Sequence, residues 1–269
     1  DPFFQWSSAG ANCWGVVTTD YGQPFHKSGA NIGAYYSTPG LVRSSLAVNS
    51  QAMNLFLARI KQVGMDFVGS AHFPAEMQGR AIIGGYYANV LEQHELILRD
   101  GIYESKQLPN IIETKNSVFR PVEVRGGPDG AIYVADWYNP IINHAQHDFR
   151  DPRRVEERGR IWRITAKGRP LVKKPVIAGA PIPALVDLLR SPEDWNRHQA
   201  RLELSGRDPG AVALELERWV GQLDRSDSAY DHHLVEAMWA YQNIDRPNEP
   251  ILQRVLAAST GHARAAGAR

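Results

Sequence analysis

The hydrophobic pattern of this chain changes its period once, and the change divides the chain into two parts. Up to residue 168 the sequence has short runs rich in Gly, Tyr, Val and Ile, broken by Gly/Pro/Asp turns, which is typical of β-structure. From about Ile182 the apolar residues recur at helical spacing. The stretch from Lys167 to Pro183 contains four Pro and three Lys, which indicates a linker. We therefore expect β-structure in residues 1–168, a linker in 169–181 and helices in 182–269.

The β-rich part contains a weak repeat with a run–turn–run form. Copies occupy residues 14–25, 67–85 and 122–133, and Gly22 of the first copy matches Gly130 of the third. The spacing of about 50 residues is near that of a four-stranded propeller blade, which needs neighbouring blades to bury its faces. The helical part, with roughly 40 residues per helix pair, is typical of a HEAT-like solenoid. The predicted fold is a partial β-propeller, comprising about three C-terminal blades, followed by an α-helical HEAT-like solenoid.

The helical pattern also predicts where the helices lie. The pair Ser191-Pro192 predicts a helix start with Pro at the first helical position. Trp195, Trp219 and Trp239 occur once per helical segment, so we expect them in the core between helices. The expected segments are 184–190, 193–204, 210–223, 228–242, 248–258 and one that begins at His262.

Composition excludes several kinds of partner and of stabilisation. The net charge of +1 gives no global field that would attract nucleic acid or an anionic membrane. The sequence has no run of about 18 apolar residues that could span a membrane. Its single cysteine, Cys13, excludes an internal disulfide and any CxxC motif. Because the sequence begins at Asp1 without Met and stops within a helical pattern, we expect it to be a piece of a longer protein.

The stretch from residue 119 to 153 carries the main candidate site. Two β runs flank a Gly/Pro/Asp turn, and Arg120 and Asp136 lie equally far from Pro128 in the sequence. A regular hairpin therefore brings this pair together at its open end, where a polar loop rich in His, Asp and Arg begins. Two interpretations remain open: the pair binds a ligand, or it forms a salt bridge that closes the hairpin.

Histidines supply further candidates. His144 and His147, followed by Asp148, have a spacing that suits two metal ligands on a loop, but the sequence marks no further ligand. We therefore predict no metal site. His26 and His72 occur in the other two repeat copies, where they either line a central channel or are structural.

Several motifs of this stretch and of the sequence after it are found together in a known family. They are RPVEVRGGPDGAIYVADWYNP at 120–140, RDPRR at 150–154, GRIWRIT at 159–165 and KGRPL at 167–171. Together they resemble the bacterial membrane-bound dehydrogenase-type proteins, also called PVC-type haem-binding CxxCH proteins. The propeller of that family is similar to the glucose/sorbosone dehydrogenases, which use pyrroloquinoline quinone (PQQ). The family order is propeller, HEAT-like helices and a cytochrome c domain.

The resemblance implies a quinone-dependent enzyme of the periplasm or cell envelope. Such an enzyme would oxidise a sugar or alcohol with PQQ, and calcium, in the full-length protein, and would pass electrons to a haem c domain. This sequence has no CxxCH and lacks the first blades, where the resemblance places a candidate base, so we expect the isolated piece to be inactive. The residues expected to line the cofactor face are Arg120, Asp136, Trp137, Asn139 and His144.

A second interpretation belongs to a different class of protein. Propellers and HEAT solenoids are both common interaction modules, and a fold does not determine a function. The chain would then be a non-catalytic scaffold. Its propeller face would bind a glycan or a protein, and the concave side of its solenoid would hold a protein partner.

Overall fold

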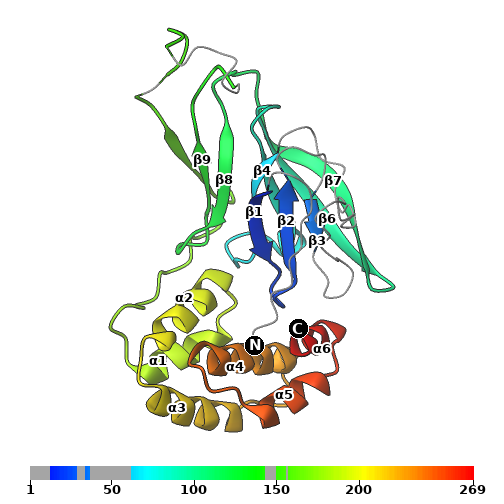
Figure 1. Cartoon of the computed structure of the whole chain (residues 1–269), viewed down its shortest axis with the longest axis vertical. Helices are drawn as coiled ribbons and strands as arrows, with labels where there is room; N and C mark the ends of the chain where they lie inside the picture. Colours follow the sequence, from blue (N-terminus) through cyan, green and yellow to red (C-terminus); the bar gives the residue numbers. More distant parts are fainter. Residues whose placement is uncertain (1–12, 29–33, 37–61, 143–149, 156) are drawn as a thin grey trace, which may run out of the picture.

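The computed structural model describes residues 13–28, 34–36, 62–142, 150–155 and 157–269. In this part of the chain, three small antiparallel sheets are followed by six α-helices, and the sheets lie above the helices in Figure 1. The division into β-structure and then helices, predicted from the change of period, is therefore confirmed. The last described strand ends at Ile164 and the first helix begins at Ile182.

Each sheet is a simple up-and-down arrangement of consecutive strands. In the second sheet, the short 3₁₀ turn Ala75–Met77 lies between the first two strands. The strands are β1 Cys13–Thr18, β2 Pro24–Ser28 and β3 Ala34–Tyr36 in the first sheet; β4 Val63–Phe67, β5 Ala81–Gly85, β6 Val90–Arg99 and β7 Ile102–Glu113 in the second; and β8 Pro121–Gly126, β9 Ile132–Asp136 and β10 Arg160–Ile164 in the third.

The sheets pack on one another through the first strand of each, and glycines allow the close approach. A Cβ atom on Gly64 of β4 would lie 2.5 Å from the Cα atom of Glu123 on β8, and one on Gly84 would lie 2.7 Å from the carbonyl oxygen of Pro121. A larger side chain at either position would separate the sheets. Two apolar clusters fill the spaces between neighbouring sheets, one around Phe25 and Met65 and one around Leu91 and Val124.

The turn of the β8–β9 hairpin follows directly from its Gly-Pro-Asp-Gly sequence. The N–H of Gly127 donates to the carbonyl oxygen of Ala131 over 2.9 Å, and the N–H of Gly130 donates back to Gly127 over 3.0 Å. Gly130 has a φ of +81°, a conformation that favours glycine. The Asp129 carboxylate closes the turn by accepting from the N–H of Ala131 over 3.1 Å. The run–turn–run pattern thus predicted the hairpin correctly.

The helices lie where the periodicity predicts them, to within a few residues. No helix in the described part of the chain is both long and apolar enough to cross a membrane. They are α1 Ile182–Asp187, extended by the 3₁₀ turn Leu188–Arg190, then α2 Asp194–Ser205, α3 Pro209–Gly221, α4 Tyr230–Asn243, α5 Glu249–Leu256 and α6 Gly261–Ala268.

The predicted start at Ser191-Pro192 is wrong. Helix α2 begins at Asp194, and Glu193 is its N-cap residue. The Ser191 hydroxyl accepts instead from the N–H of Glu193 over 3.2 Å and from the side-chain amide of Asn196 over 3.0 Å. Ser191 therefore organises the turn before the helix, a role that competes with helix capping.

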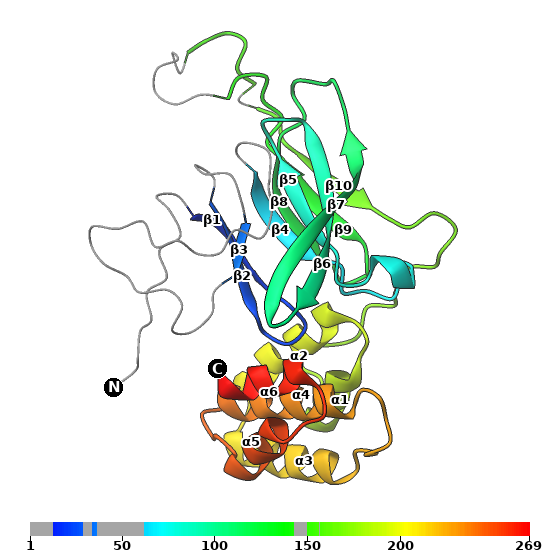
Figure 2. The same ribbon diagram turned by 90° about the vertical axis from the view of Figure 1, so that its right-hand side faces the viewer.

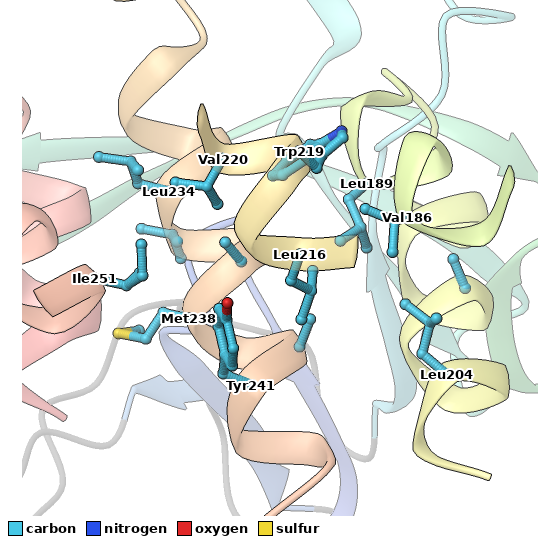
Figure 3. Close-up of a cluster of buried hydrophobic side chains, with 14 of the residues drawn as sticks. Val186, Leu189, Leu204, Leu216, Trp219, Val220, Leu234, Met238, Tyr241 and Ile251 are labelled. Carbon is cyan, nitrogen blue, oxygen red and sulfur yellow. The ribbon is translucent and has the colours of Figure 1, made fainter. Parts of the chain in front are cut away.

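The helices share one apolar core, and the three tryptophans predicted for it differ in position. Trp219 of α3 is buried there and lies beside Leu189 in Figure 3. Trp239 is only partly buried and packs at the edge of the core. Trp195, by contrast, lines a cleft between α2 and the sheets, so its expected place in the core is wrong.

In addition to the linker, hydrogen bonds and ion pairs join the sheets directly to the helices. The N–H of Asp194 donates to the carbonyl oxygen of Gly69 over 3.0 Å, and Glu193 accepts from the N–H of Ala71 over 2.9 Å. The β1–β2 turn lies above α4 and α6 in Figure 2, where Asp20 pairs with Arg197 and His232. These contacts hold the N-terminal end of α2 against the lower ends of the sheets.

Candidate functional site

Arg120 lies at the upper end of the β8–β9 hairpin, where the sequence places it, but its guanidinium is used inside the protein. The side chain is buried, and it donates to three carbonyl oxygens. These belong to Tyr86 at 2.8 Å, Asn139 at 3.0 Å and Pro140 at 3.2 Å. Arg120 therefore ties the hairpin to the second sheet and to the loop that follows β9.

Asp136 is close to Arg120, as the hairpin symmetry predicts, although the two side chains form no ion pair in the described structure. One Asp136 oxygen accepts from the backbone N–H of Arg120 over 2.7 Å and from that of Tyr138 over 3.0 Å. The other accepts from the indole N–H of Trp162 over 2.9 Å. The salt-bridge interpretation is therefore replaced by a carboxylate that bonds two backbone donors and a side chain of β10.

The remaining candidates at this end differ sharply in exposure. Asn139 is buried, and its side-chain oxygen accepts from the N–H of Ile141 over 3.0 Å. Trp137 is 42% exposed and projects from the hairpin. Two other aromatic residues, Trp14 and Tyr87, are similarly exposed at this end of the sheets. Tyr86 links them, since its ring lies 6.4 Å from Trp14 and 5.5 Å from Tyr87.

This arrangement does not fit a quinone or calcium site built from the predicted residues. Hydrogen bonds within the protein occupy the Arg120 guanidinium, both Asp136 carboxylate oxygens and the Asn139 side-chain oxygen, whereas the Trp137 side chain is 42% exposed. Within the described residues, no group of three or more His, Cys, Asp or Glu side chains could hold a metal ion. His144 lies outside the described residues, as do His147 and Asp148.

His72 is a structural residue. Its Nε2 atom accepts from the N–H of Ala166 over 2.8 Å, so the ring nitrogen Nδ1 carries the proton and donates to the carbonyl oxygen of Pro170, also over 2.8 Å. Both bonds hold the chain after β10 against the second sheet. His26 is also buried, and burial lowers its pKa.

A cleft of about 510 Å³ lies at the other end of the sheets, between their lower edge and helix α2. That volume is typical of small-molecule sites. Its walls combine apolar residues of the sheets with polar residues of α2 and the β8–β9 hairpin. Those that matter most below are Asp66, Phe67, Phe73, Arg125, Asp194, Trp195 and His198.

Asp66 is the most perturbed group in this cleft. Its pKa is raised to about 6, mainly by burial and in addition by the nearby charge of Asp194. Hydrogen bonds from the N–H groups of Phe67, at 2.9 Å, and Gly126, at 2.8 Å, and the charge of Arg125 offset only part of this effect. A carboxyl group with such a pKa in a cleft is a recognised mark of a functional site.

The sequence analysis missed this cleft, although one signal was present. Asp66 interrupts the apolar run of β4, and a carboxylate inside a buried strand is more informative than an exposed one. The contribution of α2 had no such signal, because the residues that meet Asp66 are more than 120 positions away in the sequence.

Comparison with known proteins gives limited similarity. Residues 61–168 match a family model described as "Domain of unknown function (DUF7133)", which is less than half of the chain. No curated protein matches the chain.

Two similar solved structures carry the name glucose dehydrogenase. One has 21% sequence identity and a TM-score of 0.39, and it covers 60% of this chain and 42% of that chain. The other has 18% identity and a TM-score of 0.36, with 60% of this chain and 46% of that chain covered. The similarity is distant, and the chain spans less than half the length of either structure.

Proposed function

We propose that this chain is part of a binding scaffold, built from about three propeller-like blades and a HEAT-like solenoid. This proposal rests on the hydrogen bonds made by the polar residues at the upper end of the β8–β9 hairpin. Arg120, Asp136 and Asn139 bind the protein's own backbone, so they stabilise the hairpin and its loop. Polar groups that are occupied in this way can support a binding surface, but they are not available to bind a substrate or to transfer a proton.

The surface that the scaffold offers to a glycan or a protein partner is the group of exposed aromatic residues at the upper end. Trp14, Tyr87 and Trp137 are partly exposed to solvent, and aromatic residues are enriched where proteins bind one another. The solenoid is a second place for a protein partner.

The second candidate is a fragment of a quinone-dependent dehydrogenase of the cell envelope that oxidises a sugar or alcohol and passes electrons to a c-type haem domain. The motifs at 120–140, 150–154 and 159–171 support it through their family resemblance. In that case PQQ would supply the redox chemistry, and Trp137 would offer it a stacking face. The polar groups that bind it would be other than Arg120, Asp136 and Asn139.

Substitution of Arg120 tests the structural role on which the scaffold proposal rests. We expect Arg120→Lys to lower the free energy of unfolding by about 2–4 kcal/mol, because an ammonium group cannot reach three carbonyl oxygens at once. The matched control is Arg125→Lys on β8, whose exposed ion pair with Glu123 is expected to contribute under about 1 kcal/mol. Urea denaturation measures both.

The functional test uses the full-length protein supplied with PQQ and calcium, assayed for dye-linked oxidation of glucose. The scaffold proposal predicts no PQQ-dependent oxidation by the wild-type protein. PQQ-dependent oxidation of glucose by the wild-type protein would overturn the scaffold proposal and support the dehydrogenase.

A further inference from the structure

We propose that the cleft between the sheets and α2 binds a small organic cation, an ammonium compound with an apolar body. The ammonium group lies by the carboxylates of Asp66 and Asp194, and the body lies against Trp195. This site is at the opposite end of the sheets from the exposed aromatic surface and does not depend on the proposed function.

The charges in the cleft favour a cation. Three carboxylates line it, those of Asp66, Glu193 and Asp194, against one guanidinium, that of Arg125. Arg125 already forms an ion pair with Glu123 over 3.3 Å, outside the cleft.

The three carboxylates differ in their partners. Asp194 pairs with Arg197 over 3.3 Å, and Glu193 accepts from the N–H of Ala71. Asp66 is half-buried and accepts from the N–H groups of Phe67 and Gly126, but it forms no ion pair within the described structure. An incoming cation would add a closer opposite charge to that of Arg125, which offsets only part of the effect of burial on Asp66.

The walls of the cleft favour an apolar body attached to that charge. Phe67 and Phe73 contribute from the second sheet and Trp195 from α2. The Trp195 ring already has one ammonium group near it, since the Lys174 Nζ atom lies 6.0 Å from the ring centroid. Carboxylates beside an aromatic ring are the combination that recognises organic ammonium ions through charge and cation–π attraction.

Binding at this position is linked to protonation. The pKa of Asp66 is raised to about 6, and a cation binds the ionised carboxylate better than the protonated carboxyl. Affinity should therefore rise with pH up to about 6 and level off above it. The other charged or titratable side chains that face the cleft are those of Glu193, Asp194, Arg125 and His198.

The first experiment compares choline with its neutral isostere 3,3-dimethylbutan-1-ol, by isothermal titration calorimetry on the whole chain. We expect choline to bind at pH 7.5 at least about tenfold more tightly than the isostere. At pH 5 the affinity for choline should fall about tenfold, the factor expected one pH unit below the pKa of Asp66. Equal binding of the two compounds, or choline binding that does not change with pH, would overturn the proposal.

Variants locate the binding in the cleft. Asp66→Asn and Trp195→Leu should each weaken choline binding about tenfold or more, because each removes one of the two attractions. The control Glu95→Gln removes an exposed charge from β6, outside the cleft, and should bind as the wild-type protein does. Unchanged binding in folded Trp195→Leu contradicts the proposal even if Asp66→Asn fails to fold. Displacement of choline by millimolar Ca²⁺ would assign the carboxylates to a metal instead.

Discussion

Gly130 shows how one residue fixes both a turn and a contact between segments. Its φ is +81°, and a Cβ atom there would lie 2.4 Å from the Ser70 Oγ atom and 2.8 Å from the His72 Cβ atom. We expect Gly130→Ala to lower the free energy of unfolding by about 3 kcal/mol or more, from backbone strain and overpacking together. Urea denaturation followed by circular dichroism measures the loss.

The matched control is Gly168→Ala. Gly168 has a similar φ of +77°, but a Cβ atom there would meet nothing within 4 Å. In Gly168→Ala the free energy of unfolding should fall only by the cost of backbone strain, about 1–2 kcal/mol. Equal losses at the two positions would mean that contact with Ser70 and His72 contributes nothing.

Single residues also show what the sequence could and could not predict. The closeness of Arg120 and Asp136 follows from hairpin symmetry, and the structure has it. The partners of the guanidinium do not follow, because Tyr86 belongs to another sheet and is brought near only by packing of the sheets. The cleft could not be predicted for the same reason, because it forms only where the sheets pack on α2. Asp66 stands out in the sequence as a carboxylate in an apolar run, but the spacing of Trp195 is typical of a core residue.

At the scale of elements, the β1–β2 turn and helix α4 are joined by a charged contact. His232 of α4 lies 3.2 Å from an Asp20 side-chain oxygen and 3.8 Å from Glu236. Burial by itself lowers the pKa of His232, but the hydrogen bond and charge of Asp20 and the charge of Glu236 outweigh burial and raise it. The pKa of Asp20 is lowered, because its contacts with His232 and Arg197 outweigh its own burial.

These directions predict how the contact responds to pH. A histidine whose pKa is raised on folding stabilises the protein fully below its unfolded pKa of about 6.5, and this contribution is lost as pH rises through the folded pKa. Asp20 stays ionised across that window, since its folded pKa is lowered. The difference in unfolding free energy between the wild-type protein and His232→Gln should therefore be larger at pH 6 than at pH 9.

Urea denaturation at both pH values measures this difference. His198→Gln on the exposed side of α2 serves as the control and should change the free energy of unfolding little. A difference for His232→Gln that grows toward pH 9 would mean that the neutral imidazole is the form that holds the turn.

The elements themselves were the easiest part to predict. Helices α2 to α6 lie within a few residues of the periodic segments, because the apolar spacing that defines a helix also defines its buried face. The start of α2 was misplaced because Ser191 serves equally well before a helix or in a turn. The contact of Asp20 with His232 left no pattern in the sequence, since 212 positions separate the two residues.

At the scale of the whole molecule, two features hold the sheets and helices together. One is the linker, and the other is the junction, where the β1–β2 turn meets α2 and α4. The linker predicted at 169–181 is attached to the sheets at its start. Arg169 donates to the carbonyl oxygens of His72 over 2.8 Å and of Ala71 over 3.0 Å, and the N–H of Val172 donates to that of Asp129 over 2.9 Å. The end of the linker is attached to the helices, since the N–H of Gly179 donates to Glu203 over 3.2 Å and Ala180 is buried in the helical core, so the segment that can let the halves separate lies between Val172 and Gly179.

Arg197 is the centre of the junction. Its buried guanidinium donates to the carbonyl oxygen of Ser191 over 2.6 Å and to Glu236 over 3.1 Å, and it also pairs with Asp20 of the β1–β2 turn. Glu236 is buried as well and is shared with Arg201. Breaking a buried pair by removing one partner typically destabilises a protein by about 3–5 kcal/mol, since it leaves a buried charge uncompensated.

We therefore expect Arg197→Met to uncouple the two halves. Calorimetry should show one unfolding transition for the wild-type protein and two for the variant, and trypsin should cleave the variant faster after Lys173, in the free part of the linker. The control Arg218→Met removes an exposed ion pair with Glu215 on α3, far from the junction, and should keep a single transition. A single transition with unchanged cleavage in Arg197→Met would show that apolar packing, and not this arginine, holds the sheets on the helices.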